Sequence, residues 1–275
     1  DTEKKKEIPR HKKEKESINE QVLNVPNNEI VLVFCIQMEY CNGVPLNFLL
    51  ETVHAKLELF IIEDIFIQIV KGVNDIHSNK LIHRDLKPSN IFITKNFQAK
   101  IGDFGLATEI RQNLKANVGT TLYQAFELGS EAYTEKVDIY ALGLILFELI
   151  FCFKTLSEKV EKIRILKGII KNIHFKNMQI QSSMDKLLHL DFNMNAMTQR
   201  GNETEKSQSE KPADKISYFN VFDYLSDEDE FLLYKLGLNK KSSELILSLS
   251  SYDPCLRPSS RELLDYVSTY EYFLS

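Results

Sequence analysis

The spacing of apolar residues predicts several helices along the chain. Between Ile61 and Ser78, apolar residues recur every three or four positions, which predicts a long amphipathic helix with one buried face. The apolar run from Ile139 to Phe153 is shorter than the roughly 20 residues that a membrane span needs, and Glu148 interrupts it. We therefore expect this run to be a buried core helix. Helical patterns also cover Ser243–Leu249 and Ser259–Tyr270.

Short runs of β-branched and other apolar residues predict strands. One run lies at Ile30–Ile36, and two shorter ones lie at Ile91–Ile93 and around Ala99–Ile101. The first run precedes the helical part of the chain without a neighbouring strand, and an isolated strand has no ladder partners. We therefore expect further strands upstream in the intact protein. Together the patterns predict an α-rich domain of the α+β class with a solitary strand in front of it.

Two stretches are too polar to support a packed core. Residues 1–28 are rich in Lys, Glu and Asn, and we expect a charged disordered segment or the end of an insertion. A second interruption, of low complexity, is expected at about residues 177–238, above all between Asn193 and Lys215. Its apolar island at Tyr218–Phe222 leaves a docking segment as the alternative. The folded domain is accordingly predicted to span residues 29–275, less this interruption.

Composition narrows the class of protein. The 275 residues are 43% hydrophobic, which suffices for a sizeable core, and the net charge of −5 argues against binding to nucleic acid or to an anionic membrane. Neither a signal peptide nor a membrane span is expected. The four cysteines show no Cys-x-x-Cys spacing, so reduced thiols in a cytoplasmic protein are favoured over disulfides or zinc ligands.

Two polar motifs contain the groups that phosphoryl transfer requires. The string His-Arg-Asp-Leu-Lys-Pro-Ser-Asn covers residues 83–90, and an Asp-Phe-Gly segment follows at Asp103. Transfer needs a carboxylate that orients the attacking hydroxyl, cations that neutralise the moving phosphate, and oxygen ligands for Mg²⁺. Asp85 suits the first role and Lys87 the second. Asn90 and Asp103 provide the oxygen ligands that Mg²⁺ prefers.

On these motifs the chain resembles the eukaryotic protein kinases over residues 30–270, apart from the interruption. The resemblance implies a protein-kinase-like fold of the α+β class: mainly the α-helical large lobe, with only the hinge strand as a remnant of the small β lobe. It implies ATP and Mg²⁺ as cofactors, Asp85 as the catalytic base and, from Lys87, serine/threonine specificity. The implied catalytic residues are Asp85, Lys87, Asn90 and Asp103. Magnesium would be held by Asn90 and Asp103.

The same resemblance implies a nucleotide site. Glu39–Cys41 would form the hinge whose backbone binds adenine, Met38 would be the gatekeeper, and Phe92 would pack beneath the adenine ring. The full implied set for ATP is Met38, Glu39, Cys41, Lys87, Asn90, Phe92 and Asp103. Upstream of these motifs the sequence contains no glycine-rich loop and no Val-Ala-Ile-Lys-like strand.

The absence of the glycine-rich loop and the lysine strand, which would cover the nucleotide, leaves two hypotheses. The chain is either the large lobe of a working kinase whose small lobe lies upstream, or a pseudokinase kept as a scaffold. The intact catalytic residues argue for the first, and the missing lysine strand argues for the second. We favour the kinase, and a Gly-x-Gly-x-x-Gly motif upstream of Asp1 would decide the matter. For the 275 residues alone, weak or absent catalysis is expected.

Further matches to the kinases lie beyond the catalytic motifs. Gly119–Glu127 resembles the end of an activation segment, in which Glu127 would form a buried ion pair with Arg257. Asp138 would hold the catalytic loop from below. Phe126 stands where the family usually has proline, so a changed loop geometry is expected at this point.

Three segments are similar to the kinases of the translation initiation factor 2 α subunit: the hinge at Cys35–Cys41, the helical run Lys136–Leu149 and the segment Glu158–Ile173. This similarity implies that subunit as the protein substrate, and roles in translation regulation and stress response. A helix matching Val160–Lys171 contributes to substrate docking in that family. Dimer contacts there fall mostly on the small lobe, so the resemblance implies a homodimer formed through the absent small lobe.

Overall fold

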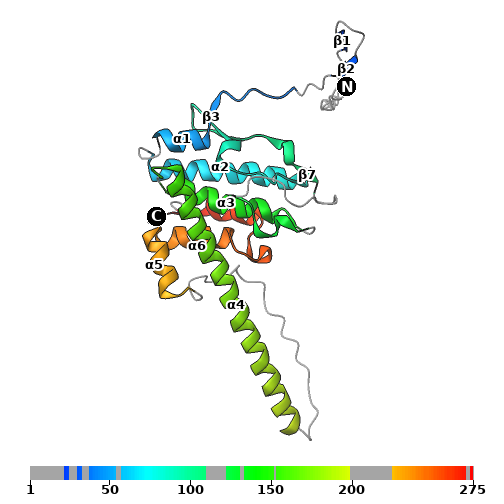
Figure 1. Ribbon diagram of the computed structural model, residues 1–275, viewed down its shortest axis with the longest axis vertical. Coiled ribbons are helices and arrows are strands. Elements are labelled where there is room, and N and C mark those ends of the chain that lie inside the picture. Colours follow the sequence, from blue (N-terminus) through cyan, green and yellow to red (C-terminus); the bar gives the residue numbers. More distant parts are fainter. Residues whose placement is uncertain are drawn as a thin grey trace, which may run out of the picture. The chain divides into compact units, whose positions relative to one another are not determined.

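The computed structural model describes residues 22–24, 30–32, 37–53, 57–109, 122–130, 133–151, 153–198, 225–270 and 273–274. The chain divides into two compact units, Asp1–Tyr40 and Cys41–Ser275. Their positions relative to one another are not determined, and Figure 1 labels the elements of each. Within the described ranges, no helix is both long enough and apolar enough to cross a membrane.

The first unit contains an antiparallel pair of strands. Strand β1 (Val22–Asn24) pairs with β2 (Ile30–Leu32), and Val22 lies opposite Leu32. The prediction of a solitary strand is therefore wrong, and residues 1–28 are not uniformly without structure. The apolar Val22 and Leu23 supply a short pairing segment inside a stretch whose overall composition is charged. Residues 33–36 of the predicted strand lie outside the described residues.

Helices form most of the second unit and confirm the predicted helical stretches. They include α2 (Leu59–Ser78), α3 (Lys136–Ile150), α6 (Lys240–Leu249) and α7 (Ser260–Thr269). Residues Val137–Leu149 of α3 are all buried, which explains why this helix is apolar on nearly every side. Helix α2 packs against α3 and α7, and α6 packs against α3, so α3 forms the centre of the core (Figure 1).

Short strands frame the loop that follows α2. An antiparallel sheet has the order β3 (Gly43–Pro45), β5 (Ile91–Thr94), β6 (Ala99–Ile101). Strand β4 (Leu81–Ile82) pairs with β7 (Thr108–Glu109), and helix α1 (Leu46–Val53) packs against β3 and β5. The string at residues 83–90 thus lies between β4 and β5. The segment that begins at Asp103 lies between β6 and β7.

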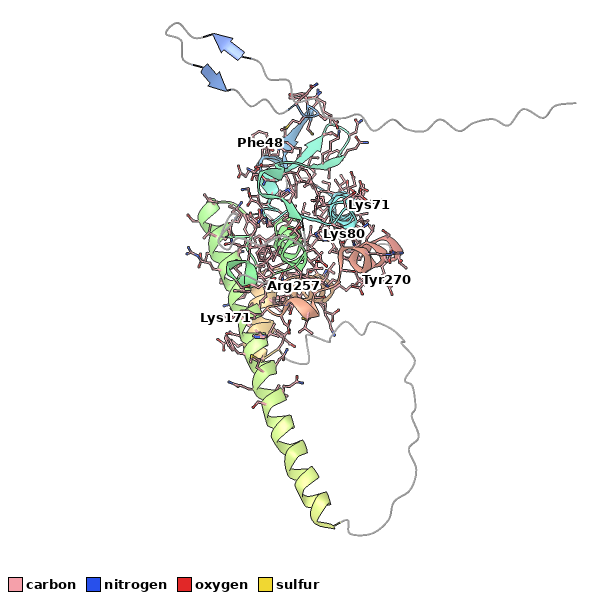
Figure 2. All side chains as sticks on the ribbon, turned by 90° about the vertical axis from the view of Figure 1, so that its right-hand side faces the viewer. Phe48, Lys71, Lys80, Lys171, Arg257 and Tyr270 are labelled. Carbon is pink, nitrogen blue, oxygen red and sulfur yellow. The ribbon has the colours of Figure 1, made fainter. Side chains whose placement is uncertain are left out.

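Parts of the predicted interruption are helical. Helix α4 continues through Leu156–Thr198, and its second half extends beyond the rest of the second unit in both views (Figures 1 and 2). Helix α5 (Asp227–Lys235) starts with a capping box formed by Ser226 and the buried Asp229. The acidic run therefore begins a helix, because negative charges in the first turn favour the positive end of the helix dipole. Residues 199–224 lie outside the described ranges.

Candidate active site

One buried carboxylate holds the loop between β4 and β5. Asp138, on α3, is 1% exposed, and its oxygens accept hydrogen bonds from the backbone N–H groups of His83 (2.8 Å) and Arg84 (2.9 Å). The ring Nε2 of His77 lies 2.9 Å from the same carboxylate. Arg84 has a left-handed backbone with a φ of 70°, a strained conformation that these bonds offset. The predicted support of the loop by Asp138 is confirmed.

The loop brings Asp85, Lys87 and Asn90 together. Asp85 is buried, and the Nζ of Lys87 lies 2.6 Å from its Oδ2. The Nδ2 of Asn90 donates to the Asp85 backbone carbonyl at 2.9 Å and lies 3.3 Å from the Asp85 Oδ2. A short 3₁₀ turn at Pro88–Asn90 places the Asn90 side chain. The Asp85 carboxylate therefore has a fixed orientation with a cation beside it.

Asp103 is connected to this loop through its neighbour Gly102. The Gly102 N–H donates to the Asn90 carbonyl at 2.8 Å, and the Nε2 of His83 donates to the Gly102 carbonyl at 3.0 Å. Asp103 itself has a left-handed φ of 60°, and its side chain accepts a bond of 3.4 Å from the N–H of Gly105. The sequence motif contained His83 without suggesting a role for it. The structure shows that its ring connects the two motifs.

The predicted nucleotide-binding residues fall into different units. Phe92, on β5, packs against Gly102, where an added Cβ would come within 3.0 Å of the Phe92 ring. Cys41 is half-buried at the start of the second unit. Met38 and Glu39 are exposed residues of the first unit. The structure therefore brings Phe92 to the Asp103 segment, but it does not place Met38 or Glu39 relative to them.

An ion pair fixes the 3₁₀ turn at Phe126–Gly129. The Arg257 guanidinium donates to both carboxylate oxygens of Glu127, at 2.5 and 2.9 Å, and to the Ser251 carbonyl at 2.7 Å. The Arg257 side chain is fully buried, in the middle of the helical body (Figure 2). A buried guanidinium needs such a full set of acceptors. The predicted ion pair is confirmed.

Phe126 takes the place of proline without disturbing that pair. It begins the 3₁₀ turn Phe126–Gly129, and its ring centroid lies 4.6 Å from that of Tyr252 and 5.6 Å from that of Tyr140. Proline would restrict the backbone, whereas phenylalanine provides ring contacts. The loop is therefore held by aromatic packing, and Glu127 forms its ion pair with Arg257.

A buried hydrogen bond near Asp85 was not predicted. The Tyr123 hydroxyl donates to the Glu148 carboxylate, and the Nζ of Lys159 lies 3.3 Å from that carboxylate. Burial is the main cause that raises the pKa of Glu148 and the pKa of Tyr123. The loop Tyr123–Ala125 lines a small cavity together with Asp85. A carboxylate inside an apolar run was the signal in the sequence that could have pointed to this contact.

A buried carboxylate beside a lysine, with amide and carboxylate oxygens close by, is the kind of site that phosphoryl transfer to a hydroxyl requires. The family described as "Protein kinase domain" matches residues 21–267. The chain belongs to this family, and its helix-rich second unit with a small antiparallel sheet has the corresponding kinase-like fold.

The curated relatives that the chain matches include kinases named for initiation factor 2α. The chain is 44% identical over 160 residues to the interferon-induced, double-stranded RNA-activated protein kinase of Rattus norvegicus, covering 56% of this chain and 31% of that protein. It is 40% identical over 154 residues to the eIF-2-alpha kinase GCN2 of Schizosaccharomyces pombe, covering 49% and 9%. It is 40% identical over 153 residues to the eukaryotic translation initiation factor 2-alpha kinase 3 of Bos taurus, covering 49% and 13%. The chain spans less than a third of the length of these relatives.

Proposed function

We propose that this chain is the catalytic region of a serine/threonine kinase that transfers the γ-phosphoryl group of ATP to the α subunit of translation initiation factor 2 in a stress response. The observation that carries the proposal is the fixed Asp85 carboxylate, bonded to Asn90 and 2.6 Å from Lys87. The names of two relatives, both of them kinases of initiation factor 2α, support the substrate. The site residues are proposed from the motif and from this geometry.

In the proposed reaction, Asp85 orients the substrate hydroxyl and accepts its proton. The carboxylate suits this role because the Asn90 amide and the Lys87 ammonium hold it in one orientation. Lys87 presents its positive charge beside the reacting hydroxyl, where the transferred phosphate would pass. Asp138 keeps both groups in position by binding the backbone of the loop.

The residues present fit a magnesium–nucleotide complex, which supplies the phosphoryl group and neutralises its charge when bound. The Nδ2 of Asn90 is bonded to Asp85, so the amide oxygen, which accepts a bond of 3.4 Å from the Ser89 hydroxyl, is the group of this side chain that could bind a cation. The backbone bond from Gly102 to Asn90 brings the exposed Asp103 carboxylate to the same loop. We propose Asn90 and Asp103 as the magnesium ligands.

The adenine site is proposed at Met38, Glu39, Cys41 and Phe92. The contact between Phe92 and Gly102 supports its part of the site, because this contact places an apolar ring beside the residue before Asp103. We also propose that residues 29–275 form a partial kinase domain, in which the large lobe is the main part. Dimerisation through a small lobe and a cytoplasmic location stay predictions.

The proposal is tested by phosphate transfer in the full-length protein. Asp85→Asn should lower the rate of transfer from labelled ATP to the initiation factor subunit by about 10²- to 10⁴-fold, because the hydroxyl loses its proton acceptor. Asp265→Asn, which changes an exposed carboxylate on α7, is the matched control and should leave the rate unchanged. A wild-type protein that binds the subunit without any transfer would favour the scaffold alternative.

A further inference from the structure

Lys167, on α4, lies in an aromatic cluster that the proposed reaction does not use. The cluster consists of Lys167, Phe126, Tyr140 and Tyr252. The Nζ of Lys167 lies 5.7 Å from the ring centroid of Phe126 and 5.5 Å from that of Tyr140. Both distances are within the range of cation–π attraction. The rings are themselves in contact, since Phe126 packs against both Tyr140 and Tyr252.

The ammonium group also reaches the loop before Phe126. The Nζ of Lys167 donates to the backbone carbonyl of Gln124 at 3.1 Å. Gln124 belongs to the loop Tyr123–Ala125, which lines a cavity together with Asp85. The bond therefore runs from helix α4 to backbone that lies beside the proposed catalytic base.

Lys167 is half-buried, and shielding of its ammonium group from water disfavours the charged form. Burial lowers the pKa of Lys167 to about 8, from the usual lysine value of 10.5. A methionine of similar length would fill the same space without the penalty of burying an ammonium group. A charge that folding disfavours, bonded to a loop beside Asp85, indicates a role in function rather than in stability.

We propose that Lys167 is a positioning residue for the protein substrate: its bond to the Gln124 carbonyl holds the loop Tyr123–Ala125 beside Asp85 and couples this loop to α4. The inference rests on the proposed kinase function and deepens it. Phe126, in place of proline, leaves the loop without a rigid backbone ring, and the Lys167 cluster supplies the anchor that proline would otherwise give.

The first test is steady-state kinetics of the full-length protein with the initiation factor subunit. Lys167→Met should lower kcat/KM for the protein substrate about tenfold, through loss of a charge-assisted hydrogen bond, and should leave KM for ATP unchanged. Lys167→Arg keeps the charge and the donor, and it should restore most of the activity. Lys235→Met removes an exposed lysine that lies 4.4 Å from the Phe231 ring on α5, and this control should show no effect.

Two further measurements separate positioning from a merely structural role. The melting temperature of Lys167→Met should equal or exceed that of the wild type, and backbone hydrogen exchange should rise at residues 123–126. An unchanged exchange rate, or an unchanged kcat/KM in an active protein, overturns the inference. A lowered melting temperature together with equal losses of kcat/KM for ATP and for the protein substrate also overturns the inference. If hydrogen exchange at residues 123–126 is faster in Lys167→Met than in the wild type, but the wild type transfers no phosphate, only the proposed function is overturned.

Discussion

The buried pair between Arg257 and Glu127 provides a direct test of the energetics of this fold. The proposed change is Glu127→Gln, which keeps the size of the side chain and removes its charge. The Arg257 side chain is fully buried, and its guanidinium also donates to the carbonyls of Ser251 and Lys136. It cannot lose its proton, so the variant leaves a buried positive charge without its carboxylate.

The expected loss follows from this geometry. Removal of one partner from a buried ion pair destabilises a protein by roughly 3–5 kcal/mol. We expect the lower end, about 3 kcal/mol, because glutamine keeps one acceptor for Arg257. The Glu127 side chain is also 15% exposed, so water can reach part of the site. For a domain of this size, about 3 kcal/mol corresponds to a melting temperature lowered by roughly 6–12 °C.

Urea unfolding followed by circular dichroism would measure the change in the free energy of unfolding. The control is Glu244→Gln, which removes the carboxylate of an exposed pair with Lys240, at 4.0 Å, and should change stability by less than about 1 kcal/mol. A double-mutant cycle with Arg257→Met isolates the coupling between the two side chains. If Glu127→Gln loses no more stability than Glu244→Gln, the reasoning about the buried pair is refuted.

Three further predictions concern the catalytic loop, the Tyr123 contact and the dependence of stability on pH. Asp138→Asn should lower kcat of the full-length protein roughly 10- to 100-fold, because its amide cannot accept both loop hydrogen bonds equally well; an unchanged kcat contradicts this. Tyr123→Phe removes a donor to the buried Glu148, so urea unfolding at pH 7 should show a loss of about 1–3 kcal/mol, and a loss near zero would count against it. The pKa of Lys167 is about 8 in the folded state and 10.5 in the unfolded state. As the pH rises, the folded protein loses this proton before the unfolded chain does, so the contribution of Lys167 to stability increases with pH between these two values. The stability of the wild type relative to Lys167→Met should therefore increase between about pH 8 and pH 10.5, because the two proteins share every other titrating group, including Tyr140; a constant difference would disprove it.

Much of the helical core could be predicted because burial leaves a periodic pattern in the sequence. The predicted helix at Ile61–Ser78 is found as α2, and the run at Ile139–Phe153 is found mainly as α3. The boundaries of helices next to the polar stretches were harder to predict, because composition alone does not show that the acidic residues from Asp227 onward begin a helix. The pairing of Val22–Asn24 with Ile30–Leu32 was missed for a similar reason: the segment is too short to stand out from its charged neighbours.

In the candidate site, too, some residues could be predicted from the sequence and others could not. The identities of Asp85, Lys87 and Asn90 are local in sequence, so the motif alone predicted which groups would act together. The roles of other residues depend on contacts between distant parts of the chain. The ring of His83 meets a carbonyl 19 residues away, and the ammonium of Lys167 meets one 43 residues away.

The sequence by itself determined the class of protein, because the phosphoryl-transfer motifs are short and contiguous and their chemistry follows from residue type and spacing. Only the tertiary structure decided what holds those motifs in place. Asp138 orients the loop from the core helix α3, and Arg257 fixes Glu127 across 130 residues. Such contacts depend on how helices pack in three dimensions, and packing brings together side chains whose separation along the chain carries no periodic signal.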